Sequence, residues 1–242
     1  MNYALHVDDS KPSRSPEGTV DVVQLFDSER GCASFAQRVL RFSEPSRRQA
    51  SSDDDEVLYV LSGSGTATFG AERRTLAPGT AAFVARGTGW SVDDADELVI
   101  LSVLVRDPLP ANGTEHAVVE LAAGETKGAT SGRQFRLLAT PDVGCASVTQ
   151  FVGYIPVGRA PDHFHRYEEV IYVLEGEGSL HIAGESAPLR PGTCIHLPAR
   201  IVHCLQNDGP GVMQVLGVFR PAGSPAEAYY PDGTPAAVPQ EA

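Results

Sequence analysis

Long apolar runs and an excess of cationic side chains are both missing from this sequence of 242 residues. No apolar run approaches the roughly 20 residues that a membrane-spanning helix needs, and the first residues lack the apolar core of a signal peptide. Nineteen Lys and Arg residues face 31 Asp and Glu residues, which gives a formal net charge of -12. Such a surface would repel a phosphate backbone. We therefore expect neither a nucleic-acid partner nor a membrane partner.

Cysteine is sparse, and its spacing matches neither a zinc site nor a disulfide framework. The four cysteines are Cys32, Cys145, Cys194 and Cys204. Cysteines of this kind are commonly small buried residues in a reducing compartment. Together with the missing export signal, they predict a cytoplasmic protein.

Helical periodicity is scarce as well. No long amphipathic stretch stands out, and short helical pieces are expected only near Leu121–Thr126 and Pro225–Tyr229. Most of the chain consists of short runs rich in Val, Leu, Ile, Tyr and Phe, separated by Gly, Pro or Asp. This pattern is typical of an all-β protein, and the length suffices for two domains of ordinary size.

What the sequence does contain is a concentration of histidines. Five of the seven lie between positions 163 and 203. His163, His165 and Glu169 have the same parity, so they share one face of an extended segment, and His203 follows after several turn-forming residues. Imidazoles with one carboxylate suit a single divalent transition metal such as Fe, Mn, Ni, Cu or Zn, whereas calcium or magnesium needs oxygen ligands. Clustered surface histidines are the less favoured alternative, because burying such a group without a partner is costly.

These spacings resemble the two motifs of the cupin superfamily. The first motif is matched by Gly158, His163, His165, Glu169 and Gly176, with one residue fewer in its first gap, and the second by Gly192, Pro198, His203 and Asn207. One departure is Arg200, where the family usually has glycine. The resemblance implies a small antiparallel jelly-roll barrel that holds a metal through His163, His165, Glu169 and His203. A Cys204 thiolate ligand is the less favoured alternative, because adjacent strand residues point to opposite faces.

The same unit occurs twice in the chain. A shift of 113 positions superposes Tyr172-Val173-Leu174 on Tyr59-Val60-Leu61, and Pro191-Gly192-Thr193 on Pro78-Gly79-Thr80, without a gap. Such a register indicates an internal duplication. The fold expected is therefore two tandem cupin barrels, which the family calls a bicupin.

The two copies differ at the metal ligands. Their equivalents in the first copy are Ala50, Ser52, Glu56 and Trp90, so we expect no metal in the N-terminal barrel and a hydrogen-bonding or rim position for Glu56. The expected segments are an extended or disordered arm (1–18), the N-terminal barrel (19–108), a linker (109–132), the C-terminal barrel (133–221) and a Pro/Ala-rich tail (222–242). The tail is expected to be poorly structured. Alternatively, its Tyr229 and Tyr230 cover the pocket or pack on the other barrel.

Other polar residues near the motifs are candidates for catalysis. His196 and Tyr154 are the first of these, because a second imidazole near a metal can transfer a proton near neutral pH. Further candidates for the pocket lining are His181, Met213 and Gln214. For His196 the sequence leaves open which face of the sheet it occupies.

Three classes of function fit this pattern, because one fold hosts many chemistries. The resemblance to the quercetinase branch and to oxalate-degrading cupins favours a metal-dependent dioxygenase-type enzyme that acts on a small organic molecule. The second class is a hydrolase, isomerase or decarboxylase. It is suggested because the arrangement of an empty first barrel and a metal-bearing second one is similar to that of (S)-ureidoglycine aminohydrolase, although the order of Glu and His in the first motif differs. The third class is a non-catalytic binding protein with a structural metal. A homodimer is possible in each case.

Overall fold

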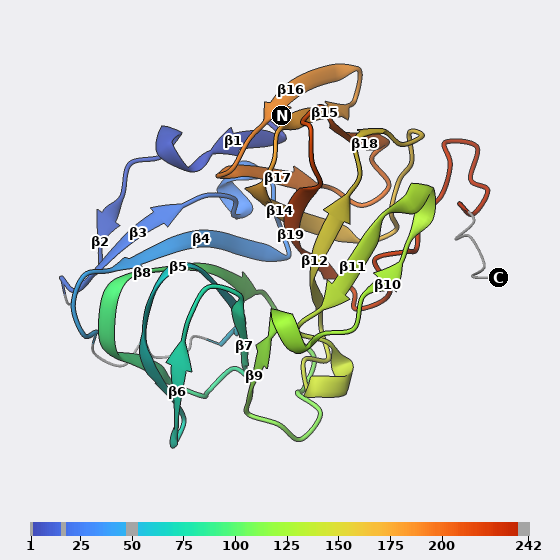
Figure 1. Cartoon of the computed structure of the whole chain (residues 1–242). Coiled ribbons are helices and arrows are strands. Elements are labelled where there is room, and N and C mark those ends of the chain that lie inside the picture. Colours follow the sequence, from blue (N-terminus) through green and yellow to red (C-terminus); the bar gives the residue numbers. More distant parts are fainter. Residues whose placement is uncertain (1, 16–17, 47–52, 237–242) are drawn as a thin grey trace.

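The computed structural model describes residues 2–15, 18–46 and 53–236, and these residues form two β-barrels that lie side by side (Figure 1). Apart from the dark-blue strand near the N-terminus, which joins the second barrel, the blue-to-green part of the chain builds one barrel and the yellow-to-red part builds the other. The expectation of an all-β chain with two tandem jelly-roll barrels is confirmed.

The N-terminal barrel is an antiparallel sheet in the order β2-β3-β4-β8-β5-β7-β9, with β6 paired to β5. Its interior holds large apolar side chains, including Phe42, Phe69 and Trp90. The strands are β2 (Ser13–Arg14), β3 (Val20–Gln24), β4 (Phe35–Phe42), β5 (Asp55–Phe69), β6 (Glu72–Leu76), β7 (Thr80–Val84), β8 (Trp90–Val105) and β9 (His116–Glu120).

The C-terminal barrel is made of two sheets. A 7-stranded sheet runs in the order β1-β17-β14-β19-β12-β11-β10, and a 4-stranded sheet in the order β13-β18-β15-β16. The first contains β1 (Ala4–His6), β10 (Lys127–Gly128), β11 (Gln134–Leu137), β12 (Thr149–Ile155), β14 (Glu168–Glu175), β17 (Thr193–Leu197) and β19 (Met213–Arg220). The second contains β13 (Gly158–Arg159), β15 (Gly178–Ile182), β16 (Glu185–Leu189) and β18 (His203–Asn207).

Helical structure in the described residues is limited to single 3-10 turns. They are η1 (Val7–Asp9), η2 (Ser28–Arg30), η3 (Leu121–Ala123), η4 (Thr130–Gly132) and η5 (Pro141–Val143). The helical piece expected near residue 121 is therefore present as η3, whereas the one expected at 225–229 is wrong, since that segment forms turns and an isolated bridge. No helix of the described residues is long and apolar enough to cross a membrane.

The two barrels exchange an edge strand. Strand β1, from the expected N-terminal arm, pairs with β17 of the C-terminal barrel, with Leu5 opposite Cys194. In return β9, from the expected linker, pairs with β7 of the N-terminal barrel. Figure 1 shows the dark-blue β1 lying against the C-terminal barrel. Each exchanged strand covers an edge of a sheet that would otherwise be open to pairing with another chain.

The interface between the barrels repeats itself across the duplication. Gln37 donates from Nε2 to the Ile171 carbonyl at 3.4 Å, and Gln150 donates to the Leu58 carbonyl at 3.3 Å. Both residues of the second pair are related to the first by the same shift of 113 positions. A shared core that contains Val57, Leu101, Val170 and Leu216 fills the space between the two sheets. All four cysteines are buried and unpaired, as expected.

The N-terminal barrel has a filled interior at the position of the second copy's metal motif. Glu56 is 2% exposed, and its carboxylate accepts hydrogen bonds from Trp90 Nε1 at 2.8 Å, from Arg38 Nη2 at 2.8 Å and from Ser102 Oγ. The hydrogen-bonding role expected for Glu56 is confirmed. The other two equivalent positions, Ala50 and Ser52, lie outside the described residues.

Candidate metal centre and active-site cavity

A cavity of about 80 Å³ lies inside the C-terminal barrel and contains the four residues expected to bind a metal. A single water requires roughly 10–15 Å³ on the same kind of measure. The cavity therefore has room for several waters or for one small organic molecule.

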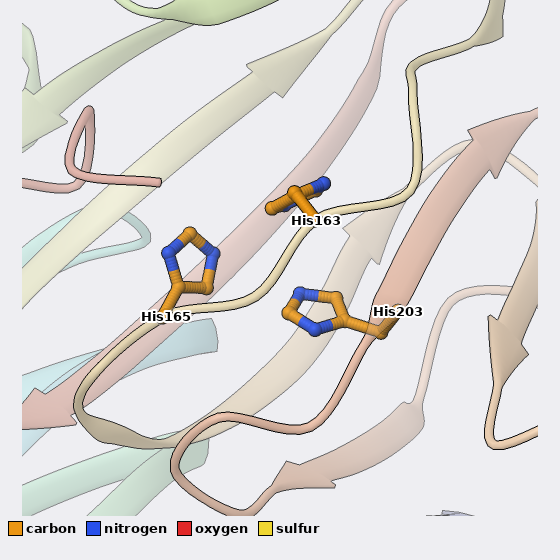
Figure 2. Close-up of side chains that lie close together, drawn as sticks. All are labelled: His163, His165 and His203. Carbon is orange, nitrogen blue, oxygen red and sulfur yellow. The ribbon is translucent and has the colours of Figure 1, made fainter. Parts of the chain in front are cut away.

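Three histidines meet in this cavity (Figure 2). His163 and His165 come from the loop that leads into β14, and His203 opens β18. A backbone bridge between His163 and His203, with N to O distances of 3.0 and 2.8 Å, holds the loop against the strand. One ring nitrogen from each histidine lies within 4.8 Å of the others. Nitrogens bound to one ion at ~2.1 Å lie at most ~4.2 Å apart, so the three rings are near enough to share one ion after small side-chain rotations.

The backbone fixes which nitrogen each ring offers. Nδ1 of His163 lies 3.0 Å from the Pro161 carbonyl, Nδ1 of His165 lies 2.7 Å from the Glu227 carbonyl, and Nδ1 of His203 lies 3.0 Å from the Ile201 carbonyl. A carbonyl only accepts hydrogen bonds, so each Nδ1 must carry the proton. Each Nε2 then keeps its lone pair for a ligand, which is the arrangement usual for metal-binding histidines.

Glu169, the second residue of β14, lies in the same cavity. Its side chain is 3% exposed, and none of the described residues donates a hydrogen bond to its carboxylate. Its oxygens are not within 4.8 Å of all three histidine nitrogens. Glu56 accepts hydrogen bonds from three donors, whereas Glu169 accepts none from the described residues. This contrast indicates that the partner of the Glu169 carboxylate is a bound ion or ligand.

Gly217 of β19 makes the space for this carboxylate. A Cβ at this position would lie 2.8 Å from Glu169 Oε1 and 2.4 Å from Phe151 Cε1. Any larger residue would displace one of the two side chains. The close approach of the backbone thus lets Glu169 reach the cavity beside an aromatic wall.

Burial sets the protonation states of these groups in the metal-free protein. Desolvation, and next the nearby His163, lower the pKa of His165 to about 3, and desolvation also lowers the pKa of His163 and His203. Desolvation raises the pKa of Glu169 to about 8, against the opposing effect of Arg133. At neutral pH all four groups are therefore uncharged, and the histidines are ready to bind a cation.

Metal uptake at pH 7 is expected to release about one proton per ion. The proton comes from Glu169, because the histidines are already neutral and a carboxylate facing a cation must ionise. The apparent affinity should rise about tenfold per pH unit below pH 8 and level off above it. Titration calorimetry in buffers of different ionisation enthalpy measures the release. Glu169→Gln should abolish it and Glu175→Gln, on the exposed end of β14, should not; an unchanged release in Glu169→Gln would exclude Glu169 from the site.

Two residues in the cavity wall were missed by the sequence reasoning. Tyr167 stacks on the His165 ring at 4.6 Å and on Phe219 at 4.0 Å between centroids. It has the same parity as His163, His165 and Glu169, so the strand pattern contained the signal. Arg133 follows η4 and also lines the cavity; no motif marked it, because it comes from a separate segment.

The C-terminal tail closes one side of the cavity. Pro225 and Ala228 line it, and Tyr229 forms a backbone bridge with Phe164 through hydrogen bonds of 2.8 and 3.0 Å. The Tyr229 ring stacks on Phe164 at 5.6 Å, with the Arg166 guanidinium 4.1 Å from its centroid. The described residues of the tail are therefore held against the C-terminal barrel, in contrast to the poorly structured extension that was expected. The tail borders the cavity through Pro225 and Ala228, whereas the alternative named the tyrosine pair, of which Tyr229 packs on Phe164.

His196 lies away from the cavity, at the interface between the barrels. Its Nε2 is 2.7 Å from Glu168 Oε1, and Glu168 also accepts hydrogen bonds from the backbone of Ala33 and Ser34 at 3.2 and 3.1 Å. Cys32 is close to both. The side chain of His196 points to the opposite face of β17 from the cavity, so the structure does not bring this candidate catalytic residue together with the metal motif.

The remaining candidates divide in the same way. Tyr154 borders the cavity. His181 bonds to Gln206 at 3.1 Å and Gln214 to Glu175 at 2.6 Å, both outside the cavity. Met213 is packed in the apolar core of the barrel and does not line the cavity. Cys204 donates to the Ala160 carbonyl and is not part of the histidine cluster.

Comparison with known sequences gives similarity in the region of the cavity. Residues 150–219 match the family described as "Cupin domain". Quercetin 2,3-dioxygenase of Bacillus subtilis is 33% identical over 82 residues, which are 29% of this chain and 24% of that protein. Polyketide synthase CurC of Streptomyces cyaneus is 34% identical over 82 residues, 32% of this chain and 53% of that protein. The matched region thus spans about a quarter to a half of these relatives.

Solved structures resemble both barrels. A putative glyoxylate-induced protein from Pseudomonas aeruginosa superposes with a TM-score of 0.74 at 18% identity, over 86% of this chain and 83% of that one. Protein Ylba from E. coli gives 0.75 at 16% identity, over 90% and 89%. A Lactobacillus farciminis oxalate decarboxylase in a formate complex gives 0.73 at 12% identity, over 91% and 86%. At these identities the likeness concerns the fold alone.

Proposed function

We propose that this chain, which belongs to the cupin superfamily, is a metal-dependent enzyme of the dioxygenase type that acts on a small organic molecule. The single observation that carries the proposal is the convergence of three imidazoles whose Nδ1 atoms are all tied to backbone carbonyls. The similarity to a quercetin dioxygenase across this region supports the reaction class. One divalent transition metal per chain, held by His163, His165, His203 and Glu169, is the expected cofactor.

The donor set fits such an ion. Three neutral nitrogens and one carboxylate suit Fe, Mn, Ni, Cu or Zn, and the unpartnered Glu169 carboxylate supplies the negative charge that offsets part of the cation's charge. When bound, the metal supplies a Lewis acid with positions open to small ligands. The chain's own residues orient the ligands: backbone carbonyls fix the imidazoles, and Tyr167 stacks on one face of the His165 ring.

Oxygen dependence distinguishes this proposal from its alternatives. The protein is purified without added metal, and elemental analysis identifies the metal it holds. In an oxygen electrode this protein should consume dioxygen with at least one compound of a library of small organic molecules. Turnover that persists under strictly anaerobic conditions would instead identify a hydrolase, isomerase or decarboxylase. Metal-dependent thermal stability without turnover of any compound would identify a non-catalytic binding protein. A His203→Ala variant, which removes a ligand, serves as the blank in each assay.

The remaining partners stay predictions. A homodimer is one of them, although two barrels in one chain already mimic the dimer that single cupin barrels commonly form. Tyr154 borders the cavity and remains a candidate for contact with the substrate. His196 is better explained as a part of the interface between the barrels.

A further inference from the structure

We infer that the substrate is a small carboxylate and that Arg133 binds its anionic group, with the organic part directed into the barrel. The inference rests on the proposed function, because it names the substrate class of the same cavity. It starts from the charges that line the cavity among the described residues. The titratable side chains among the residues that line the cavity are the three histidines, two tyrosines, Glu169 and Arg133. Arg133 is the one permanent cation among them.

The position of Arg133 links it to both sheets of the barrel. It lies between η4 and β11, which belongs to the 7-stranded sheet, and its Nη2 donates to the Leu205 carbonyl in β18 at 2.7 Å. Leu205 is two residues from His203 on the same strand, so both side chains share one face of β18. The guanidinium is therefore held at the cavity, near the histidines, by the Leu205 bond and by a contact with the neighbouring Cys204 thiol, which leave further N–H groups of its five for a ligand.

Arg133 has no carboxylate partner within ion-pair distance among the described residues. The carboxylate of Glu169 affects its charge only from farther away. A partly buried guanidinium without an ionic partner is costly. A planar carboxylate offers it two parallel hydrogen bonds, which is the geometry that arginine fits best. An anionic ligand thus supplies the interaction that the protein leaves unmade.

With a divalent metal bound, the cavity would carry a net positive charge, although the protein as a whole is acidic. A divalent metal and Arg133 together outweigh the single Glu169 carboxylate, whereas the chain as a whole has a formal charge of -12. Local positive potential inside a low-dielectric wall attracts and orients small anions. Large polyanions would be repelled by the surrounding surface, which limits the expected ligand to a compact molecule.

The walls and the volume define the rest of the ligand. Phe135, Ile155, Leu205 and Val215 present apolar surface to the cavity. The volume of about 80 Å³ has room for several waters, at roughly 10–15 Å³ each, and therefore for a short carbon chain. The expected substrate class is therefore a short carboxylate with an apolar body.

Binding of propionate and of its neutral analogue propionamide tests the inference. Titration calorimetry with the protein as purified, and again after removal of its metal by a chelator, gives both affinities. Propionate should bind about 10- to 100-fold more tightly than propionamide, as expected for a charge-assisted pair. Arg133→Gln should abolish the preference, and Arg133→Lys should retain part of it. Arg190→Gln, which removes the same charge from an exposed turn of the same barrel, should leave it unchanged.

Each outcome decides the question. Equal affinity for both probes, no propionate binding to the wild type, or a preference that survives in Arg133→Gln overturns the inference. Circular dichroism and the retained function of Arg133→Lys exclude misfolding as the cause of a loss. If elemental analysis finds no metal but the metal-free protein prefers propionate, the proposed function fails and the role of Arg133 stands. If metal and turnover are found without the preference, only the role of Arg133 fails.

Discussion

A His163→Ala variant is expected to lose its metal, whereas the wild type purifies with one ion per chain. His163 is one of three histidines whose ring nitrogens lie close together, and its backbone also forms a β-bridge with His203. Altering a residue that only supports a ligand typically costs about 10- to 100-fold in metal affinity, so removing a ligand should cost more. Elemental analysis after dialysis against a weak chelator measures the effect.

A matched control comes from the same barrel. His181→Ala removes a histidine on β15 that contacts Gln206 outside the cavity, so this variant should keep its full metal content. Full occupancy in His163→Ala would contradict the assignment of the ligands. Equal loss in both variants would point to a general effect on folding, which the circular dichroism spectrum of each variant reports.

A Trp90→Ala variant is expected to lower the free energy of unfolding by about 3–5 kcal/mol, as for other large aromatic side chains removed from a core. Trp90 is 1% exposed and packs against Phe42 and Phe69 at centroid distances of 6.1 Å. It also donates to Glu56, so the substitution removes a hydrogen bond from a buried carboxylate. Urea unfolding followed by circular dichroism measures the change, since this is the only tryptophan and fluorescence would vanish with it.

Trp90→Phe separates packing from hydrogen bonding. It retains most of the apolar volume and removes the indole N–H, so its cost should be about 1–3 kcal/mol. Both variants should still bind one metal in the C-terminal barrel. A stability unchanged within 1 kcal/mol in Trp90→Ala would contradict the view that Trp90 fills the space of a lost metal site, and loss of metal from Trp90→Phe would contradict the separation of the two interiors.

The sequence predicted the parts of the site that depend on local spacing. The shared parity of His163, His165 and Glu169 placed them in one cavity, although the first two lie in a loop that only bridges to β18 and not in a continuous strand. Comparison of the two copies predicted a hydrogen-bonding or rim position for Glu56, and the structure shows the first of these. These features follow from alternation along one segment and from comparison of the two copies.

The features that the sequence did not predict depend on contacts between distant segments. The facing of His196 could not be decided across the turn at Pro198, and the structure directs it to Glu168 at the interface. Arg133 gave no local signal, because its role depends on a hydrogen bond to a strand more than 70 positions later. The pairing of β1 with β17 is of the same kind, since 3 residues contain too little pattern to name a partner.

The exchanged strands also impose an order on synthesis. The first barrel can be completed only after β9 (His116–Glu120) has left the ribosome, and β1 must wait for Thr193–Leu197. Strand β1 is thus made long before the strand with which it pairs. Because contacts this distant in sequence form slowly, both β1 and the edge of the first barrel's sheet stay unpaired while the intervening residues are made, and over this interval they are open to pairing with another chain.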